Sequence, residues 1–331
     1  MTSMLRKTLF TLNEEEMATR EGFGTGLVES AKEHPQVVAI CADLTESTKM
    51  DAFKKVFPDR FFEVGITEQA MSGVASGMAA MGYKPFMASY AMFSPGRNWE
   101  QIRTTICYNN QPVTIVGAHA GISVGPDGAT HQALEDIAIM RTLPNMTVLV
   151  PLDAVEAHAM THFLATYKHP AYIRLGREKT PVMLPDGHTF NFGKATIISL
   201  PEAKHGKEFM YKVGVIGCGP IIYEALLAAK ELEKEGIGVT VVNSSTVKPL
   251  DTGFLLRFAK DVKAFVTVEE AQIAGGLGSA IAEYMSEHHP MKVIKVGIQD
   301  RFGQSGKPKE LYQEYNLTKD DIKQAIYRAI Q

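Results

Sequence analysis

Ten short runs rich in Val and Ile recur along the chain, and each is apolar on successive residues rather than on alternate ones. This pattern is typical of strands that are buried on both faces of a parallel sheet. Longer amphipathic segments separate the runs, and alternating strands and helices indicate an α/β fold. We therefore expect doubly wound parallel sheets. Their strands are predicted at residues 37–41, 85–89, 113–118, 147–150, 171–174, 195–200, 213–218, 239–243, 264–268 and 292–296.

The intervening segments have the spacing of helices. Examples lie at residues 14–33, 67–81, 154–167, 221–235 and 278–288. The stretch at 179–192 differs, because it holds two Pro and a Gly and has no helical period. We interpret it as a linker between a first domain at 1–178 and a second at 193–331. Two domains suit a chain of 331 residues.

Charge and cysteine content exclude several classes of protein. The net charge is −3, from 34 basic and 37 acidic side chains, and no basic stripe stands out, so nucleic acid is not an expected partner. Three widely spaced cysteines, Cys41, Cys107 and Cys218, indicate neither a disulfide framework nor a zinc site. No apolar stretch has the length of a signal peptide or a membrane span. We expect a soluble cytoplasmic protein without a membrane partner.

Three short motifs suggest other chemistry but lack its context. The Gly-Cys-Gly at 217–219 resembles a dinucleotide fingerprint, yet Ile222 stands where a third small residue is needed, so a tight turn is favoured. Ser123 lies in a Gly-x-Ser-x-Gly run, but Pro-Asp-Gly follows, which leaves a serine hydrolase as a remote alternative. His158 and His162 lie four apart on a predicted helix, without an evident third zinc ligand.

The segment at 60–135 holds the most informative residues. Thr67 is a plausible N-cap, and Glu68 then lies in the first turn of the helix. Gly73 and Gly77 share one face of that helix, although Gly costs about 1 kcal/mol per helical position relative to Ala. They indicate a close backbone approach, either to the chain's own sheet or to a helix of another subunit.

Candidate ligand-binding residues follow the ends of the next predicted strands. Tyr90 and Phe93 stand at the end of one strand, and His119 ends another. Asp127 and His131 lie four apart in a polar, glycine-rich loop at 125–132. The carboxyl ends of parallel strands are where α/β proteins bind their ligands, so we expect these side chains to share a site.

Together these motifs resemble the transketolase family. The Gly-Ile-Thr-Glu-Gln run at 65–69, the Asp-Gly-Ala-Thr-His-Gln loop at 127–132 and the Arg-Thr-Leu-Pro-Asn run at 141–145 occur in the family's order and spacing. The resemblance covers nearly the whole chain but only the second half of an ordinary transketolase. It implies a pyrimidine-binding domain followed by a C-terminal domain, as in the C-terminal subunit of a split, two-gene transketolase.

The resemblance implies thiamine diphosphate as the cofactor. It identifies Glu68 as the catalytic carboxyl group that hydrogen-bonds the aminopyrimidine ring, so that the cofactor can lose its thiazolium C2 proton. Ile66 matches a cofactor contact in the same run, and Tyr90 and Phe93 match aromatics that stack on the aminopyrimidine. The family often has a third aromatic just beyond, where this chain has Ser-Pro-Gly-Arg at 94–97.

The resemblance also assigns a sugar phosphate site. Asp127 matches a residue that reads hydroxyl stereochemistry, and His131 matches a catalytic His near the terminal hydroxyl of the donor. Arginine suits phosphate because its guanidinium can form two parallel hydrogen bonds. The residues that match phosphate ligands are Arg20, Ser47, His119 and Arg177.

One absent motif predicts a partner. The family binds the cofactor's diphosphate and Mg²⁺ through a Gly-Asp-Gly motif followed by Asn, and no Gly-Asp-Gly occurs in this chain. We therefore assign no metal ligand here and expect an N-terminal subunit to supply Mg²⁺. The resemblance then implies a heterotetramer that is active only when both subunits are present.

The expected activity is transfer of a two-carbon ketol unit from a ketose phosphate to an aldose phosphate. Alternatives are a subunit that resembles deoxyxylulose-phosphate synthase or the beta subunit of a 2-oxo acid dehydrogenase, and a non-catalytic structural homologue. The loop with Asp127 and His131 and the candidate phosphate ligands favour sugar phosphates over 2-oxo acids.

Overall fold

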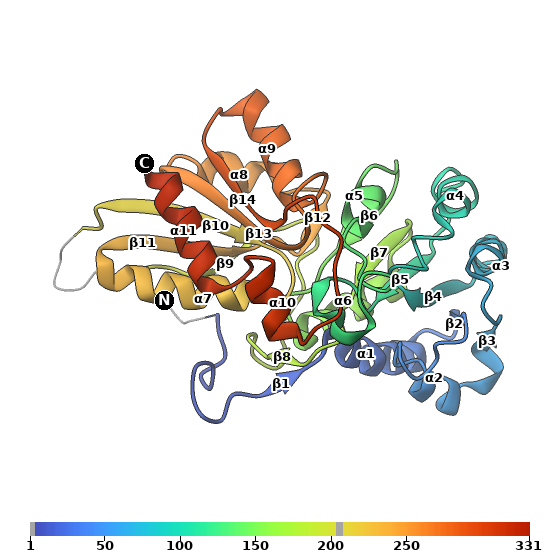
Figure 1. Cartoon of the computed structure of the whole chain (residues 1–331). Helices are drawn as coiled ribbons and strands as arrows, with labels where there is room; N and C mark the ends of the chain where they lie inside the picture. The colour runs from blue at the N-terminus through green and yellow to red at the C-terminus, as the bar shows by residue number, and fades with distance from the viewer. Residues whose placement is uncertain (1–3, 203–207) are drawn as a thin grey trace.

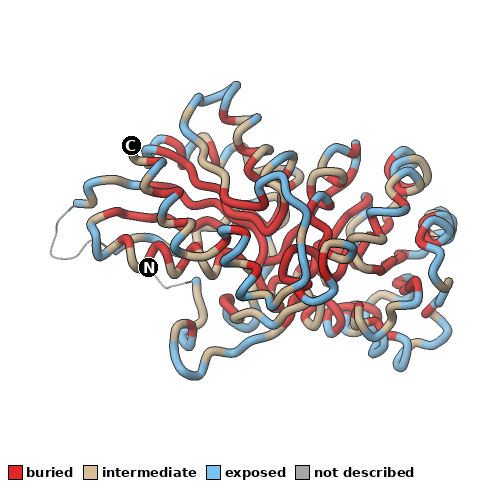
Figure 2. Tube along the Cα trace, viewed as in Figure 1, coloured by how far each residue is buried: buried red, intermediate tan, exposed pale blue. Residues whose placement is uncertain are grey.

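The computed structural model describes residues 4–202 and 208–331 and shows two lobes side by side, each built on a largely parallel sheet (Figure 1). The doubly wound α/β class expected from the sequence is confirmed. Buried residues concentrate in the two sheets and where the lobes meet (Figure 2). No helix within residues 4–202 and 208–331 is long and apolar enough to cross a membrane.

The first sheet has seven strands in the order β12-β6-β7-β5-β4-β2-β3. Neighbouring strands are parallel except β12 and β6, which pair antiparallel. The sequence did not predict β3 or β12, each of which is three residues long. The strands are β2 (Val37–Cys41), β3 (Phe61–Glu63), β4 (Lys84–Tyr90), β5 (Thr114–Ala118), β6 (Thr147–Leu149), β7 (Ala171–Arg174) and β12 (Thr246–Lys248).

The second sheet has five strands in the order β14-β13-β10-β11-β9. The expectation of a parallel strand at 195–200 is wrong, because β9 pairs antiparallel with β11 at the sheet edge and is mostly half-buried. A two-stranded sheet joins β1 (Glu16–Met17) to β8 (Thr180–Pro181). The five strands are β9 (Thr196–Ser199), β10 (Tyr211–Gly217), β11 (Ile237–Asn243), β13 (Ala264–Gln272) and β14 (Val293–Ile298).

Helices cover both faces of each sheet (Figure 1). On one face of the first sheet, Phe23, Leu27 and Met160 pack in a cluster with strand residues, and Met71 packs on the other face. The helix predicted from residue 14 begins only at Thr19, because β1 precedes it. The helices are α1 (Thr19–Glu33), α2 (Asp51–Val56), α3 (Glu68–Ala80), α4 (Trp99–Gln101), α5 (Asp136–Arg141), α6 (Ala154–Thr166), α7 (Ile222–Leu232), α8 (Thr252–Phe258), α9 (Leu277–His288), α10 (Pro308–Glu314) and α11 (Lys319–Ile330).

Several segments tie the two lobes together. Strand β12 comes from the second half of the chain but pairs with β6 in the first sheet. The segment interpreted as a linker is packed rather than free, since the amides of Met183 and Leu184 donate to Asp153 at the start of α6. Near the N-terminus, Phe10 stacks on Tyr223 of α7 in the second lobe. The lobes therefore share a continuous interior.

A buried carboxylate lies at this junction. Glu156 of α6 accepts hydrogen bonds from the Asn243 amide, the Ser245 hydroxyl at 2.8 Å and the Leu152 amide at 2.6 Å. Burial raises the pKa of Glu156 from 4.5 to about 7, although these donors act in the opposite direction.

We expect Glu156 to make the stability of the fold depend on pH. Because its pKa is higher in the folded chain, the stability it contributes is full below about pH 4.5 and is lost as the pH rises through about 7. Urea unfolding of wild type and Glu156→Gln, which cannot titrate, isolates this effect. The wild-type stability relative to the variant should fall by at most about 3 kcal/mol across that window. A difference that stays constant with pH would contradict the assignment.

Candidate functional site

The sequence-predicted residues gather at one edge of the first sheet. Strands β7, β5, β4, β2 and β3 are neighbours and run parallel, so their carboxyl ends meet there. This is the edge at which α/β sheets bind ligands. The predicted residues follow these strands in turn, with Ser47 after β2, Ile66 and Glu68 after β3, Tyr90 ending β4, His119 after β5 and Arg177 after β7.

A cationic cluster forms one part of this edge. Arg20, in the first turn of α1, donates to the carbonyl of Ser47 at 2.8 Å and lies 3.4 Å from His119 Nε2. Ser47 thus meets Arg20 through its main chain, not its hydroxyl. Arg177 lies 3.9 Å from Asp127 and donates to the Val124 carbonyl at 2.6 Å.

The electrostatics of this cluster suit an anion. Burial lowers the pKa of His119 to about 3, and the charges of Arg20 and Arg177 act in the same direction, so the imidazole is neutral near pH 7. Burial also lowers the pKa of Arg20. Arg20 Nε and His119 Nδ1 are buried without a hydrogen-bond partner in the described part of the chain. Buried polar atoms are normally paired, so these two nitrogens fit a bound oxyanion such as phosphate.

An aromatic cluster lies beside the cationic one. The Tyr90 ring stacks on His119 with centroids 3.9 Å apart and on Phe93 at 5.9 Å. His131 meets both aromatic rings edge-on, at 6.2 Å from Tyr90 and 5.4 Å from Phe93. Thr130 Oγ1 lies 2.9 Å from Nδ1 of His131. These contacts place the two candidate stacking residues next to the candidate substrate residue His131.

Glu68 is the first residue of α3, and only 4% of its surface is exposed. Its two carboxylate oxygens lie 3.2 and 3.3 Å from Nη1 of Arg97, whose guanidinium lies over the Phe93 ring at 4.2 Å. Sequence reasoning did not select Arg97, although a cation four residues after Phe93 was a usable signal. The contact joins Glu68 to the aromatic cluster.

The structure describes two further residues of the loop before α3. Thr67 is the N-cap residue of α3, as the sequence predicts, although its hydroxyl donates to the Val64 carbonyl and makes no capping hydrogen bond. Ile66 is 69% exposed, so its side chain packs little against the described residues. The role of Ile66 as a cofactor contact stays a prediction.

Backbone strain is present at the same edge. His119, directly after β5, has φ of 52°, and Asp43, after β2, has φ of 57°. This left-handed conformation is unfavourable for residues other than glycine, by roughly 1–3 kcal/mol. Asp43 is held in place by its amide, which donates to Glu63 at 2.7 Å. Such strain clusters at functional sites.

The structure does not support the alternative functions suggested by the motifs at Ser123 and Gly217. Ser123 lies in a short 3₁₀ segment, η3 (Ile122–Asp127), and its amide donates to Glu270 at 2.6 Å. Its hydroxyl has no hydrogen bond to a His in the part of the chain that the structure describes, so a serine hydrolase is not supported. At Gly217 an added Cβ would lie 2.7 Å from the Ile222 side chain, which accounts for the glycine as a packing requirement of a tight turn.

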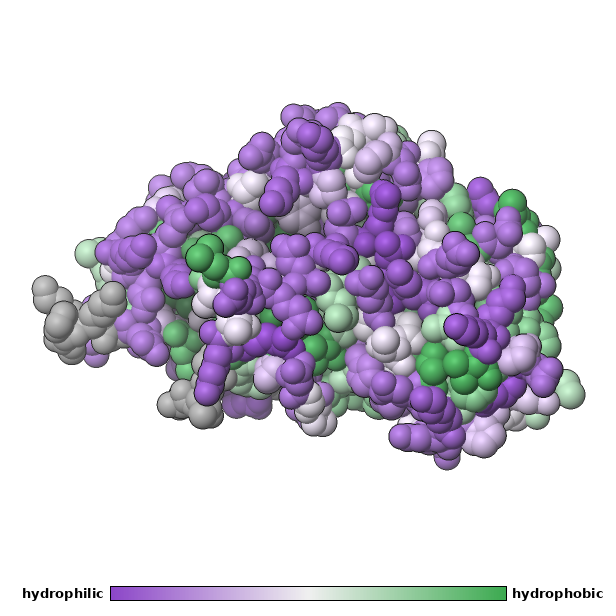
Figure 3. All heavy atoms as spheres, turned by 90° about the horizontal axis from the view of Figure 1, so that it is seen from below, coloured by the Kyte–Doolittle hydropathy of each residue, from purple (hydrophilic) through white to green (hydrophobic). Residues whose placement is uncertain are grey.

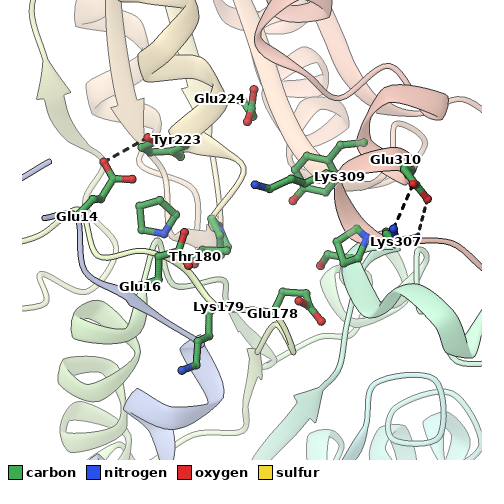
Figure 4. A pocket seen from close by; sticks show the side chains of 15 residues that line it. Glu14, Glu16, Glu178, Lys179, Thr180, Tyr223, Glu224, Lys307, Lys309 and Glu310 are labelled. Atoms are coloured by element: carbon green, nitrogen blue, oxygen red, sulfur yellow. Dashed lines mark hydrogen bonds and ion pairs between the residues drawn. The ribbon is translucent and has the colours of Figure 1, made fainter. Parts of the chain in front are cut away.

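A cavity of about 770 Å³ opens between the lobes (Figure 4). Five Glu and three Lys line it, together with Ser123 and residues of β8 and α10, and Tyr223 donates to Glu14 across one side. Of the residues predicted for the cofactor and the sugar phosphate, none lines this cavity. Glu178 in its lining directly follows Arg177, so the cavity borders the carboxyl-end edge of the first sheet.

The sequence patterns of two protein families match the chain. Residues 15–183 match the transketolase pyrimidine binding domain, and residues 203–322 match the transketolase C-terminal domain.

Individual relatives share this arrangement. A putative transketolase C-terminal section of Methanocaldococcus jannaschii is 40% identical over 93% of this chain and 94% of the relative. A 6-deoxy-6-sulfo-D-fructose transketolase subunit of Clostridium sp. is 36% identical over 96% of each chain. A 1-deoxy-D-xylulose-5-phosphate synthase of Syntrophus aciditrophicus is 36% identical over 92% of this chain but only 46% of the synthase.

A solved structure described as a split gene transketolase in an inactive beta4 tetramer is also similar. It has a TM-score of 0.85 and 43% identity, and the match covers 95% of this chain and 98% of that one. The two family matches, the similar sequences and the similar solved structure thus all indicate the same family. The chain belongs to the transketolase family and consists of that family's pyrimidine-binding and C-terminal domains.

Proposed function

We propose that this chain is the C-terminal subunit of a split, thiamine-diphosphate-dependent transketolase. With an N-terminal partner it transfers a two-carbon ketol unit from a ketose phosphate to an aldose phosphate. The observation that carries the proposal is the meeting of a buried carboxylate, an aromatic cluster and a cationic cluster at one sheet edge. No single one of these features would distinguish this family from other α/β proteins.

The cofactor end of the site is built from Glu68, Tyr90 and Phe93. When bound, thiamine diphosphate supplies the carbon nucleophile that takes up the ketol unit. Glu68 holds a hydrogen bond at the aminopyrimidine ring, and Arg97 contacts both oxygens of the same carboxylate. Tyr90 and Phe93, both half-buried and mutually stacked, offer a surface for the aminopyrimidine.

The substrate end of the site is built from the cationic cluster. Arg20, Arg177 and the neutral His119 bind the phosphate, and the two unpaired nitrogens gain partners when they do. His131 and Asp127 then contact sugar hydroxyls between the phosphate and the cofactor. A 2-oxo acid carries no phosphate, so this cluster favours sugar phosphates. The identity of the sugars is left open, because the similar subunits are named for different ones.

The exposed face of α3 supports a partner subunit. A Cβ added at Gly73 or Gly77 would meet nothing within 4 Å, so these glycines do not pack against the chain's own sheet. Of the two explanations that the sequence left open, packing on the chain's own sheet is wrong. Val74 on the same helix is 40% exposed, and Met81 at its end is 78% exposed. We assign this face to another subunit, namely the one that binds the diphosphate and Mg²⁺.

A deoxyxylulose-phosphate synthase is the second candidate, because a synthase is 36% identical to this chain. The chain spans about half of that synthase. The two activities differ in the donor, which is pyruvate for the synthase and a ketose phosphate for transketolase. Turnover with pyruvate but with no ketose phosphate would replace the proposal by this alternative.

We expect Glu68→Gln to reduce turnover of the reconstituted two-subunit enzyme by at least about 100-fold, because the side chain acts in proton transfer. Assembly with the partner, measured by analytical ultracentrifugation, should be unchanged. The matched control is Glu100→Gln, an exposed carboxylate in the neighbouring helix α4. Wild-type turnover in Glu68→Gln would refute the assignment.

Removing the arginines should weaken phosphate binding. Arg20→Ala and Arg177→Ala are expected to raise the KM for the aldose phosphate about tenfold or more, as a charged hydrogen bond is worth about 1.5–3 kcal/mol. The same variants should use a phosphate-free aldose as well as wild type does. If kcat alone falls, or both acceptors suffer equally, the phosphate role is wrong.

The isolated chain should show no ketol transfer, and adding the N-terminal subunit should restore it. Val74→Asp places a charge on the exposed face of α3 and should weaken assembly without unfolding the chain. Ser286→Asp, on the exposed side of α9, is the control and should assemble normally. Turnover by the isolated chain, or normal assembly of Val74→Asp, would contradict the assigned interface.

A further inference from the structure

We propose that Glu29, His158 and His162 form a binding site for a divalent transition metal of the Zn²⁺ class. Glu29 lies on α1, and the two histidines lie one turn apart on α6. One ligand atom from each of the three residues can be chosen so that all lie within 4.8 Å of one another. The site lies outside the sheet edge and does not depend on the proposed transketolase activity.

The close approach of α1 and α6 brings these side chains together. A Cβ added at Gly22 would lie 1.9 Å from the Ala154 carbonyl oxygen, and one at Gly26 would lie 3.0 Å from the His158 carbonyl. Only glycine therefore allows the two backbones to meet here. Glu29 follows Gly26 by three residues, so it lies on the same face of α1, toward α6.

The distances among the three side chains fit a metal site. Oε2 of Glu29 lies 2.9 Å from Nε2 of His158 and 3.5 Å from Nε2 of His162. The His162 nitrogen is shielded from solvent and makes no hydrogen bond within the described residues. Both histidines therefore direct the same ring nitrogen at one carboxylate oxygen. A tetrahedral Zn²⁺ site needs donor atoms about 3–3.5 Å apart, given Zn–N bonds of about 2.0–2.1 Å.

The ligand types select the metal. Two imidazoles and one carboxylate are typical of Zn²⁺ and of its neighbours Co²⁺, Ni²⁺ and Cu²⁺, whereas Mg²⁺ and Ca²⁺ prefer oxygen donors. Cys41, Cys107 and Cys218 are all buried, and burial raises their thiol pKa values, so thiolates do not compete.

The surroundings leave the site open to a metal. About a third of each histidine side chain and half of the Glu29 side chain are exposed. Helix α1 runs along the lower side of the molecule in Figure 1, and the underside seen in Figure 3 is mostly hydrophilic. Three protein ligands leave one position for water. A bound metal would join α1 to α6. Because Arg20 lies in the first turn of α1, metal binding should also stabilise the helix that carries Arg20.

The test is titration of the full, tag-free chain with Zn²⁺ in an isothermal calorimeter. Wild type should bind one Zn²⁺ saturably, and Glu29→Gln, His158→Ala and His162→Ala should each weaken binding by at least about 10–100-fold. The matched control is the double variant His288→Ala/His289→Ala, which removes two histidines at the end of α9, away from the proposed site. Its affinity should equal that of wild type.

A second measurement guards against misfolded variants. Co²⁺ bound to wild type should give the visible absorption of a four-coordinate site with nitrogen ligands, and Glu29→Gln, which is nearly isosteric, should lose it while keeping a wild-type circular dichroism spectrum. Zn²⁺ should raise the melting temperature of wild type and of the control, but not of Glu29→Gln. The proposal is overturned if wild type shows no saturable one-to-one binding, or if only the His288/His289 variant loses it.

Discussion

A buried ion pair between Arg174 and Asp136 fixes the position of several segments around it. Arg174 Nε lies 2.8 Å from Asp136, and Nη2 donates to the Glu270 carbonyl of the second lobe at 2.9 Å. The Glu270 carboxylate in turn accepts from the Ser123 amide and the Tyr312 hydroxyl. Breaking a buried pair leaves an uncompensated charge and typically costs about 3–5 kcal/mol. One strand end thus fixes both the junction of the lobes and the start of the loop that carries Asp127.

The contacts of Arg174 also help to position the residues of the candidate site. Arg177 follows Arg174 by three residues, and its guanidinium is held by the Val124 carbonyl of the same loop. Burial and the nearby arginines keep His119 neutral, so the cluster presents positive charge without placing another cation among the arginines. If the cluster binds phosphate as proposed, the anion would pair with nitrogens that are already desolvated, which costs less than removing water from an exposed pair. The strained backbone at His119 fits a position that the surrounding sheet over-determines.

The sequence predicted well what depends on local pattern and poorly what depends on distant partners. The continuous apolar runs located most strands of both sheets, because a strand buried on two faces has a strong signal. The sequence pattern did not predict β12, because this strand has only three residues and pairs with β6 in the sheet of the other lobe. It predicted β9 as a parallel strand, because the direction of pairing depends on the neighbouring strand β11 and not on the local sequence. Arg97 and Glu29 were missed for the same reason. Each gains its meaning from a contact with a residue of another element, namely Glu68 for Arg97 and the α6 histidines for Glu29.

Helix α3 links two requirements that are separate in the sequence. Its first residue, Glu68, is buried beside the aromatic cluster, while Gly73 and Gly77 on the same 13-residue helix face open space. The glycine face and Glu68 belong to one continuous helix of 13 residues, which is about 20 Å long. Any chain that packs against the glycine face therefore contacts the element that carries the candidate catalytic carboxylate. The outward glycines lower the stability of α3 in the free chain. Close packing of another backbone against this face would offset that loss, because only glycine leaves room for it.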